Sequence, residues 1–227
     1  MKKQWIGERK ISEITKQHFL DYTFYDSILD IDNDSFMKNL AKTYDQLKEY
    51  HTANGKWTEQ LIQENVTYDP SYYLEDFNIF NFPHKELYVI FKNIKKLLVV
   101  ACEEDNTNID EQQYYIHAWL NYFPGKMHQS KEYEDLYWHD HGQNANEFHG
   151  YYAVNAEPSI THYRVDDEKL DRENINGRLV LAKTGIDHAV GKWNFDMPRI
   201  SIAYNLMPIK NLILAKSIDN IPFIPFP

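Results

Sequence analysis

The first half of the chain repeats apolar residues at intervals of three and four, the spacing of one face of a helix. This pattern predicts a helix over Ser35–His51, with Ser35 as its N-cap, and a stronger helix over Lys85–Glu103. A shorter helix is expected over Trp57–Asn65, followed by an irregular aromatic segment that ends at Pro83. Because the apolar faces of the long helices must be buried, we expect these helices to pack against a sheet.

The second half has a different pattern, in which short runs of aromatic and β-branched residues alternate with polar or Gly/Pro loops. The first expected strand covers Tyr114–Phe123 and ends at the turn Pro124-Gly125. The remaining expected strands lie near Phe148–Asn155, Ser159–Arg164, Arg178–Ala182, His188–Lys192 and Arg199–Leu206. Short strands at this spacing are typical of a barrel or a sandwich.

The rest of the chain is less regular. A short strand is expected near Trp5–Ile11, and Phe19–Tyr25 forms a cluster of aromatic residues. The segments Phe123–Tyr137 and Asp166–Asn174 are expected as loops that border the opening of the β core. The apolar, proline-rich tail Ile218–Pro227 is expected to lie across the surface without forming an element.

No internal repeat or linker divides the sequence, so residues 1–227 are expected to form one domain. In this domain residues 1–110 are a mostly helical support, residues 111–207 form the β core and residues 208–227 are a tail. The fold class is therefore mainly β with N-terminal helices (α+β), the helices packing on one side of the core.

Composition excludes some classes of function. The net charge of −10 argues against broad nucleic-acid binding, because phosphate contacts need clustered Lys and Arg. The single cysteine, Cys102, cannot form an intramolecular disulfide and favours a reducing compartment. No run approaches the ~18 apolar residues that cross a bilayer, and the N-terminus has no apolar signal segment. We therefore expect a cytoplasmic protein without membrane contact.

Candidate chemistry lies between residues 138 and 205. His139 and His141 are two residues apart, so on a strand both imidazoles point to one face. Neutral imidazoles in this arrangement can hold a divalent metal if a third ligand comes from another strand, and His188 is the candidate. Arg199 and Ser201 share a face of the last strand and would offer a guanidinium and a hydroxyl to a carboxylate.

These residues belong to an ordered set of motifs. The set reads Trp119-Leu-Asn121, Gly125, His139-Asp-His141, Gly150-Tyr-Tyr152, Asn176-Gly-Arg-Leu-Val180, His188 and Arg199-Ile-Ser-Ile-Ala-Tyr-Asn205. From Ala118 to Leu206 the chain thereby resembles the Fe(II)/2-oxoglutarate-dependent oxygenases, whose common core is a double-stranded β-helix, or jelly roll. It is most similar to the members of that superfamily that are common in phage and marine bacterial genomes.

The resemblance implies a function and a set of roles. His139, His141 and His188 would hold Fe(II). Arg199 would pair with the C5 carboxylate of 2-oxoglutarate, helped by Ser201 and by Tyr152, with the neighbouring tyrosine facing the other way. The implied reaction consumes O₂ and 2-oxoglutarate, releases succinate and CO₂, and hydroxylates a substrate that the sequence does not identify. The sequence does not indicate the oligomeric state.

One position departs from the superfamily pattern, which has His-x-Asp or His-x-Glu where this chain has His139-Asp-His141. The third ligand is therefore either His141, favoured by same-face geometry, or Asp140, if the strand ends or bulges at His139. Two other functions stay open. A histidine-bound zinc in a cupin-like barrel could activate water for hydrolysis, or the core could be a non-catalytic binding protein.

Overall fold

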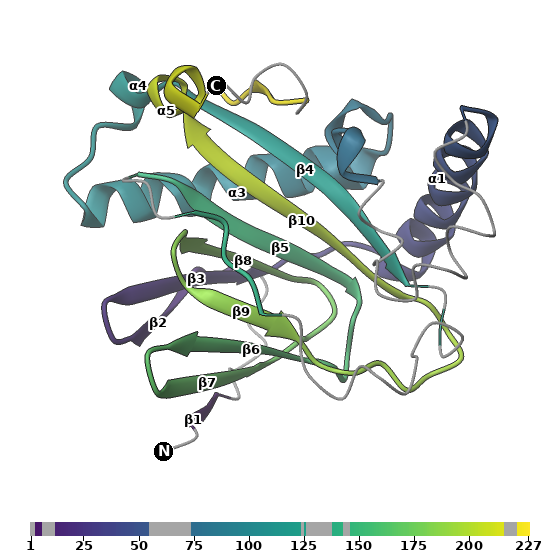
Figure 1. Ribbon diagram of the computed structural model, residues 1–227, viewed down its shortest axis with the longest axis horizontal. Helices are drawn as coiled ribbons and strands as arrows, with labels where there is room; N and C mark the ends of the chain where they lie inside the picture. Colours follow the sequence, from purple (N-terminus) through teal and green to yellow (C-terminus); the bar gives the residue numbers. More distant parts are fainter. Residues whose placement is uncertain are drawn as a thin grey trace.

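The computed structural model describes residues 3–5, 12–54, 74–123, 125, 138–142, 146–215 and 222–227. Its strands form two sheets, mostly antiparallel, and a few helices accompany them, so that the fold is α+β (Figure 1). In the described part of the chain, no helix is long and apolar enough to cross a membrane.

The larger sheet has the strand order β11-β4-β10-β5-β8-β3-β2 and is antiparallel throughout. Its strands are β2 (Thr15–Phe19), β3 (Tyr22–Ile28), β4 (Tyr114–Phe123), β5 (Phe148–Asn155), β8 (Arg178–Lys183), β10 (Arg199–Pro208) and β11 (Ile224–Pro225). Strand β10 lies inside the sheet, paired along its whole length with β4 and along most of it with β5.

The smaller sheet has the order β1-β7-β6-β9, and only its β1–β7 pair is parallel. Its strands are β1 (Lys3–Trp5), β6 (Ile160–Val165), β7 (Glu168–Glu173) and β9 (Asp187–Val190). An isolated bridge adds His139 to β9, on the side away from β6. The two sheets pack face to face, as the ring contact of Phe24 in β3 with Tyr163 in β6 shows (centroids 4.7 Å apart).

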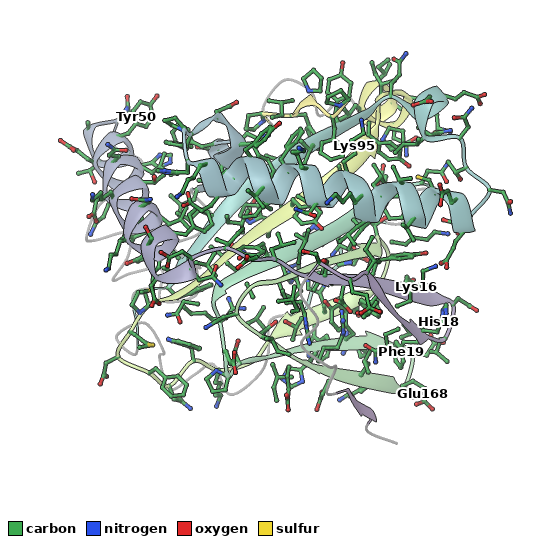
Figure 2. All side chains as sticks on the ribbon, turned by 180° about the vertical axis from the view of Figure 1, so that it is seen from behind. Lys16, His18, Phe19, Tyr50, Lys95 and Glu168 are labelled. Carbon is green, nitrogen blue, oxygen red and sulfur yellow. The ribbon has the colours of Figure 1, made fainter. Side chains whose placement is uncertain are left out.

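The helices are α1 (Asn33–Ala53), the 3-10 helix η2 (Ile79–Asn81), α3 (Lys85–Glu104), α4 (Ile109–Gln112) and α5 (Ile209–Ala215). Seen from behind, α3 crosses the large sheet, with Lys95 on the helix and Lys16 on the neighbouring hairpin (Figure 2). Apolar residues of α1 and α3 form one core with the large sheet. An ion pair between Lys16 and Glu104 ties the end of α3 to β2.

The large sheet is therefore buried on both faces. In β5, Tyr152 belongs to the core beneath the helices, whereas Tyr151 packs with the core between the sheets. The same alternation separates Leu179 from Val180 in β8. Successive residues of a strand point to opposite faces. Every second side chain of these strands therefore faces the space between the two sheets.

The two long helices and the strands named for the second half of the chain are confirmed, with shifts of a few residues at their ends. The expected N-cap was wrong, because α1 begins at Asn33. Asp32 is the cap, and its side chain accepts a hydrogen bond from the Ser35 amide.

Some expectations lie outside the described residues. They are the helix over Trp57–Asn65, nearly all of the strand near Trp5–Ile11 and most of the loop Phe123–Tyr137.

The aromatic cluster Phe19–Tyr25 is part of the β2–β3 hairpin, so the N-terminal region also contributes strands to the large sheet. Two other expectations were wrong. The segment Asp166–Asn174 is not a loop, because it contains β7. In the tail, Ile224–Pro225 pairs with β4 as β11, and the buried ring of Phe226 lies 4.6 Å from that of Phe91.

Candidate metal centre

The candidate centre begins with two histidines that are joined through their backbones. The amide of His139 donates to the carbonyl of His188 (3.1 Å), and the amide of His188 donates to the carbonyl of His139 (2.9 Å). Side chains of directly paired antiparallel residues lie on the same face, and the two ring centroids are 4.3 Å apart. Strand β9 in turn pairs His188 with Tyr163 of β6, which fixes the position of this histidine in the sheet.

His141 completes a group of three. Its ring is nearly parallel to that of His188 (10°), with centroids 5.0 Å apart, and lies 5.4 Å from the ring of His139. One nitrogen from each of the three residues lies within 4.8 Å of the others, a spacing at which they could hold a metal ion. The three histidines expected as ligands are therefore brought together, although of the pair His139 and His141 only His139 is paired as in a strand.

Asp140 lies differently. This residue is exposed, and its Oδ1 accepts a hydrogen bond from the amide of Gly142 at 2.9 Å. Gly142 has a φ of +89°, a conformation that glycine adopts without strain. The carboxylate thus serves the turn that follows the histidine pair and does not belong to the group of possible ligands.

Burial keeps the central histidines neutral. Desolvation, with smaller contributions from His188 and His139, lowers the pKa of His141 to about 3. Desolvation and the neighbouring His139 lower the pKa of His188 to about 4. A neutral imidazole has a nitrogen lone pair free for coordination, so near neutral pH these two residues present metal-binding donors.

Aromatic rings surround the group. The ring of Trp119 lies 6.0 Å from that of His141 and stacks on His117 at 5.1 Å. On the other side, Tyr163 lies 5.8 Å from His188. These rings limit the access of water to the histidines. Electrostatic interactions are stronger where water is excluded.

A fourth histidine was not assigned from the sequence. His149 in β5 is 5% exposed, and its ring lies 4.9 Å from that of His141 and 5.0 Å from that of His188. The alternation of side chains along the strand could have indicated this position, because His149 is two residues from Tyr151 and lies on the same inner face of β5.

Arg199 and Ser201 also lie inside the protein, 4% and 3% exposed. Nη1 of Arg199 lies 3.5 Å from Ser201 Oγ, and Nε donates to Ser159 Oγ at 3.3 Å. Ser159 is itself fixed, because its hydroxyl donates to the Ala156 carbonyl (2.5 Å) and accepts from Asn174 Nδ2 (2.9 Å). The guanidinium is therefore held on the inner face by a hydrogen-bond network.

The assignment of Tyr152 was wrong. Its side chain lies in the core beneath the helices, fully buried, and its hydroxyl donates to Asn33 Oδ1 at 2.7 Å. The residue on the inner face is Tyr151. Its buried hydroxyl has no hydrogen-bond partner among the described residues.

Comparison with known proteins adds little. No family model matches the chain, and no curated protein matches it. Among solved structures, one described as "Non-heme monooxygenase, ThoJ-Ni complex" is 14% identical, with a TM-score of 0.32 over 51% of this chain and 48% of that chain. The match thus spans about half the length of either protein, and a likeness of this size supports neither a family nor a function.

Proposed function

We propose that this protein is an Fe(II)- and 2-oxoglutarate-dependent oxygenase that hydroxylates a substrate still to be identified. The observation that carries the proposal is the three-histidine group, in which one nitrogen from each residue lies within 4.8 Å of the others. Arg199 and Ser201 are buried in the same core and carry the groups that bind a carboxylate.

The three histidines fit a transition metal. Imidazole suits Fe, Zn, Cu and Ni, and three protein ligands leave open positions for other molecules. His139, His141 and His188 would hold the ion, which when bound supplies the activation of O₂. The donor set has no carboxylate, so the ion would keep more positive charge than in a two-histidine, one-carboxylate site.

Arg199 and Ser201 would bind the C5 carboxylate of 2-oxoglutarate. The register of β10 places Ala203 beside Trp119 and Asn205 beside His149, close to the histidines. Arg199 is four to six residues away, roughly 13–20 Å along the strand. A long arginine side chain and a five-carbon dicarboxylate can span that distance together. The network through Ser159 would orient the guanidinium before the co-substrate arrives.

The course of the chain supports a jelly roll. From β4 to β10 the chain visits the sheets in the order large, small, large, small, small, large, small, large, if the bridge at His139 is included. Jelly rolls are double sheets of eight strands that follow this kind of winding. The double-stranded β-helix is therefore part of the proposal.

Within such a site the residues of this chain bind, orient and exclude water. Arg199 and Ser201 would fix one end of the co-substrate, and the rings of Trp119 and Tyr163 would shield the histidines from solvent. The products would be succinate, CO₂ and the hydroxylated substrate.

A second candidate is a zinc hydrolase in a cupin-like barrel. The all-histidine donor set favours it, because three histidines are also the ligands of some catalytic zinc sites. This function does not use Arg199, and it predicts no effect of 2-oxoglutarate.

The test is a titration of 2-oxoglutarate into anaerobic protein loaded with Fe(II), followed by visible absorption. We expect a weak charge-transfer band near ~500 nm that disappears in His188→Ala. Arg199→Lys should retain iron but need more 2-oxoglutarate for the same absorbance, since lysine cannot form the bidentate pair. If iron is bound but 2-oxoglutarate changes neither the spectrum nor the melting temperature, the oxygenase proposal is wrong and hydrolysis with zinc should be assayed.

A further inference from the structure

On β5 and β10, three buried polar atoms on the inner face of the large sheet have no hydrogen-bond partner within the described residues. They are His149 Nε2, Tyr151 Oη and Asn205 Oδ1. His149 and Asn205 are direct partners across β5 and β10. Buried polar atoms are nearly always satisfied by protein, water or a ligand, so this group indicates that something polar binds beside the histidines.

The ring positions indicate what His149 binds. For a metal–nitrogen distance of about 2.0–2.1 Å, each imidazole centroid lies about 3.2 Å from the ion. Two such rings are then about 4.5 Å apart at a right angle and about 5.2 Å apart at the tetrahedral angle. His149 lies 4.9 Å from His141 and 5.0 Å from His188, within that interval. The ring of His139 lies slightly outside it, at 4.3 Å from His188 and 5.4 Å from His141. His149 is not in the group whose nitrogens lie within 4.8 Å of one another, so its ring would have to shift to bind the same ion.

We propose that His149 is a fourth nitrogen ligand of the metal centre. This inference rests on the metal centre of the proposed function but not on 2-oxoglutarate. It accounts for the buried Nε2 atom, which in the protein alone has no partner among the described residues. Burial within the sheet also limits the alternatives, because His149 is held in β5 between β10 and β8.

A fourth histidine changes what the site can accept. Four imidazoles leave two positions of a six-coordinate ion, whereas three imidazoles leave three. A chelating 2-oxo acid would fill both of those positions, so His149 would have to leave the ion before a further molecule could bind there.

The test measures the affinity for Co(II) by competition with a chelator, in wild type and in His149→Phe. Phenylalanine keeps a buried ring and removes both nitrogens. We expect the affinity to fall at least about tenfold, with a change in the d–d absorption of bound Co(II). The metal-free variant should melt no lower than wild type, since a same-shaped apolar group replaces a buried polar atom that lacks a partner.

A matched control is His51→Phe, in which the same change is made at a fully buried histidine of α1, against Phe77. This control should bind Co(II) as wild type does. If His149→Phe binds Co(II) with unchanged affinity and spectrum, His149 is not a ligand and the inference is wrong. If its affinity falls but 2-oxoglutarate has no effect on wild type, the inference stands and the oxygenase function fails.

Discussion

The backbones of His139 and His188 exchange two hydrogen bonds, of 3.1 and 2.9 Å, although the residues are far apart in sequence. This bridge places two imidazoles side by side through main-chain pairing, without requiring the side chains to attract one another. The pairing therefore holds two possible metal ligands next to each other.

Replacing His188 should remove metal binding and leave the metal-free fold largely intact. A ligand that binds only the folded state raises the melting temperature. We expect Ni(II) or Co(II) to raise the melting temperature of wild type but not of His188→Ala, measured by differential scanning fluorimetry. His162→Ala is the control, because His162 in the same sheet pairs with Asp171 and is not in the histidine group. An equal metal-induced rise in His188→Ala would contradict the proposed centre.

Replacing Ser159 should weaken the binding of 2-oxoglutarate without affecting the metal. The Ser159 hydroxyl accepts from Arg199 Nε and is held by Asn174, so its loss frees the guanidinium to move. One hydrogen bond contributes about 1 kcal/mol, which corresponds to roughly a fivefold rise in Kd. Calorimetric titration of 2-oxoglutarate into metal-loaded Ser159→Ala measures this change. A variant that also loses Co(II) would show that the serine supports the whole core.

The stability of the metal-free protein should fall with acid, and His117 should contribute to the fall. Desolvation lowers the pKa of His117 from 6.5 to about 4, although its hydrogen bond to the Glu75 carbonyl opposes this shift. Between these values the unfolded state binds the extra proton, so the free energy of unfolding decreases as pH falls. The slope is about 1.4 kcal/mol per pH unit for one group.

His117→Gln can still donate to Glu75 but does not titrate. Urea unfolding from pH 7 to pH 4 should therefore show a shallower decline in this variant, by about 3 kcal/mol over the whole range. The carboxylates titrate in both proteins, so the difference between the two curves isolates His117. Parallel curves would mean that the pKa of His117 is the same in the folded and unfolded states, which would contradict the prediction.

Much of the fold could be predicted because the spacing of apolar residues along the chain shows which side of a helix or strand is buried. Helix α3 has one apolar face and was predicted to within a residue at its end. Strand β7 was missed because its inward residues include Arg172, which is fully buried yet looks like a surface residue in the sequence. Hydrophobic patterns cannot reveal a strand whose buried positions are charged.

The site was predicted in part for a related reason. The spacing of His139 and His141 suggested a shared face. Alternation along β5 puts His149 on one face of that strand, but it does not show that this face lies opposite the histidine pair. The choice between Tyr151 and Tyr152 failed because the large sheet is buried on both faces, so both tyrosines occupy apolar surroundings. An irregularity between residues 200 and 201 shifts the pairing of β10 with β5. Counting alternate residues along one strand therefore does not show which residues of the other strand lie on the same face.

The buried ion pair between Asp26 and Arg172 should be important for stability. Arg172 is 0% exposed, its Nη2 donates to Asp26 Oδ2 at 2.5 Å, and its guanidinium lies 4.5 Å from the Phe24 ring. Asp26→Asn keeps the shape and removes the countercharge of a buried cation, which costs about 3 kcal/mol. Chemical denaturation measures this loss. The control is Asp187→Asn, whose half-exposed pair with Arg164 should change stability by less than about 1 kcal/mol.

Gly150 should tolerate no side chain, because two strands approach it closely. The Tyr204 hydroxyl donates to the Val180 carbonyl at 2.5 Å across this position. A Cβ on Gly150 would lie 2.0 Å from that carbonyl oxygen and 2.5 Å from the hydroxyl. Gly150→Ala must therefore displace backbone, and we expect a loss of about 3 kcal/mol or more in the free energy of unfolding, measured by urea denaturation.

The matched control for this change is Gly191→Ala, where the nearest atom, the Ile160 carbonyl oxygen, is 3.0 Å from the added Cβ. It should cost less than about 1 kcal/mol. Adding Tyr204→Phe to Gly150→Ala removes the hydroxyl but leaves the Val180 carbonyl in place, so stability should recover only in part. Full recovery in the double variant would show that the tyrosine hydroxyl, and not the backbone of β8, is what requires glycine in β5.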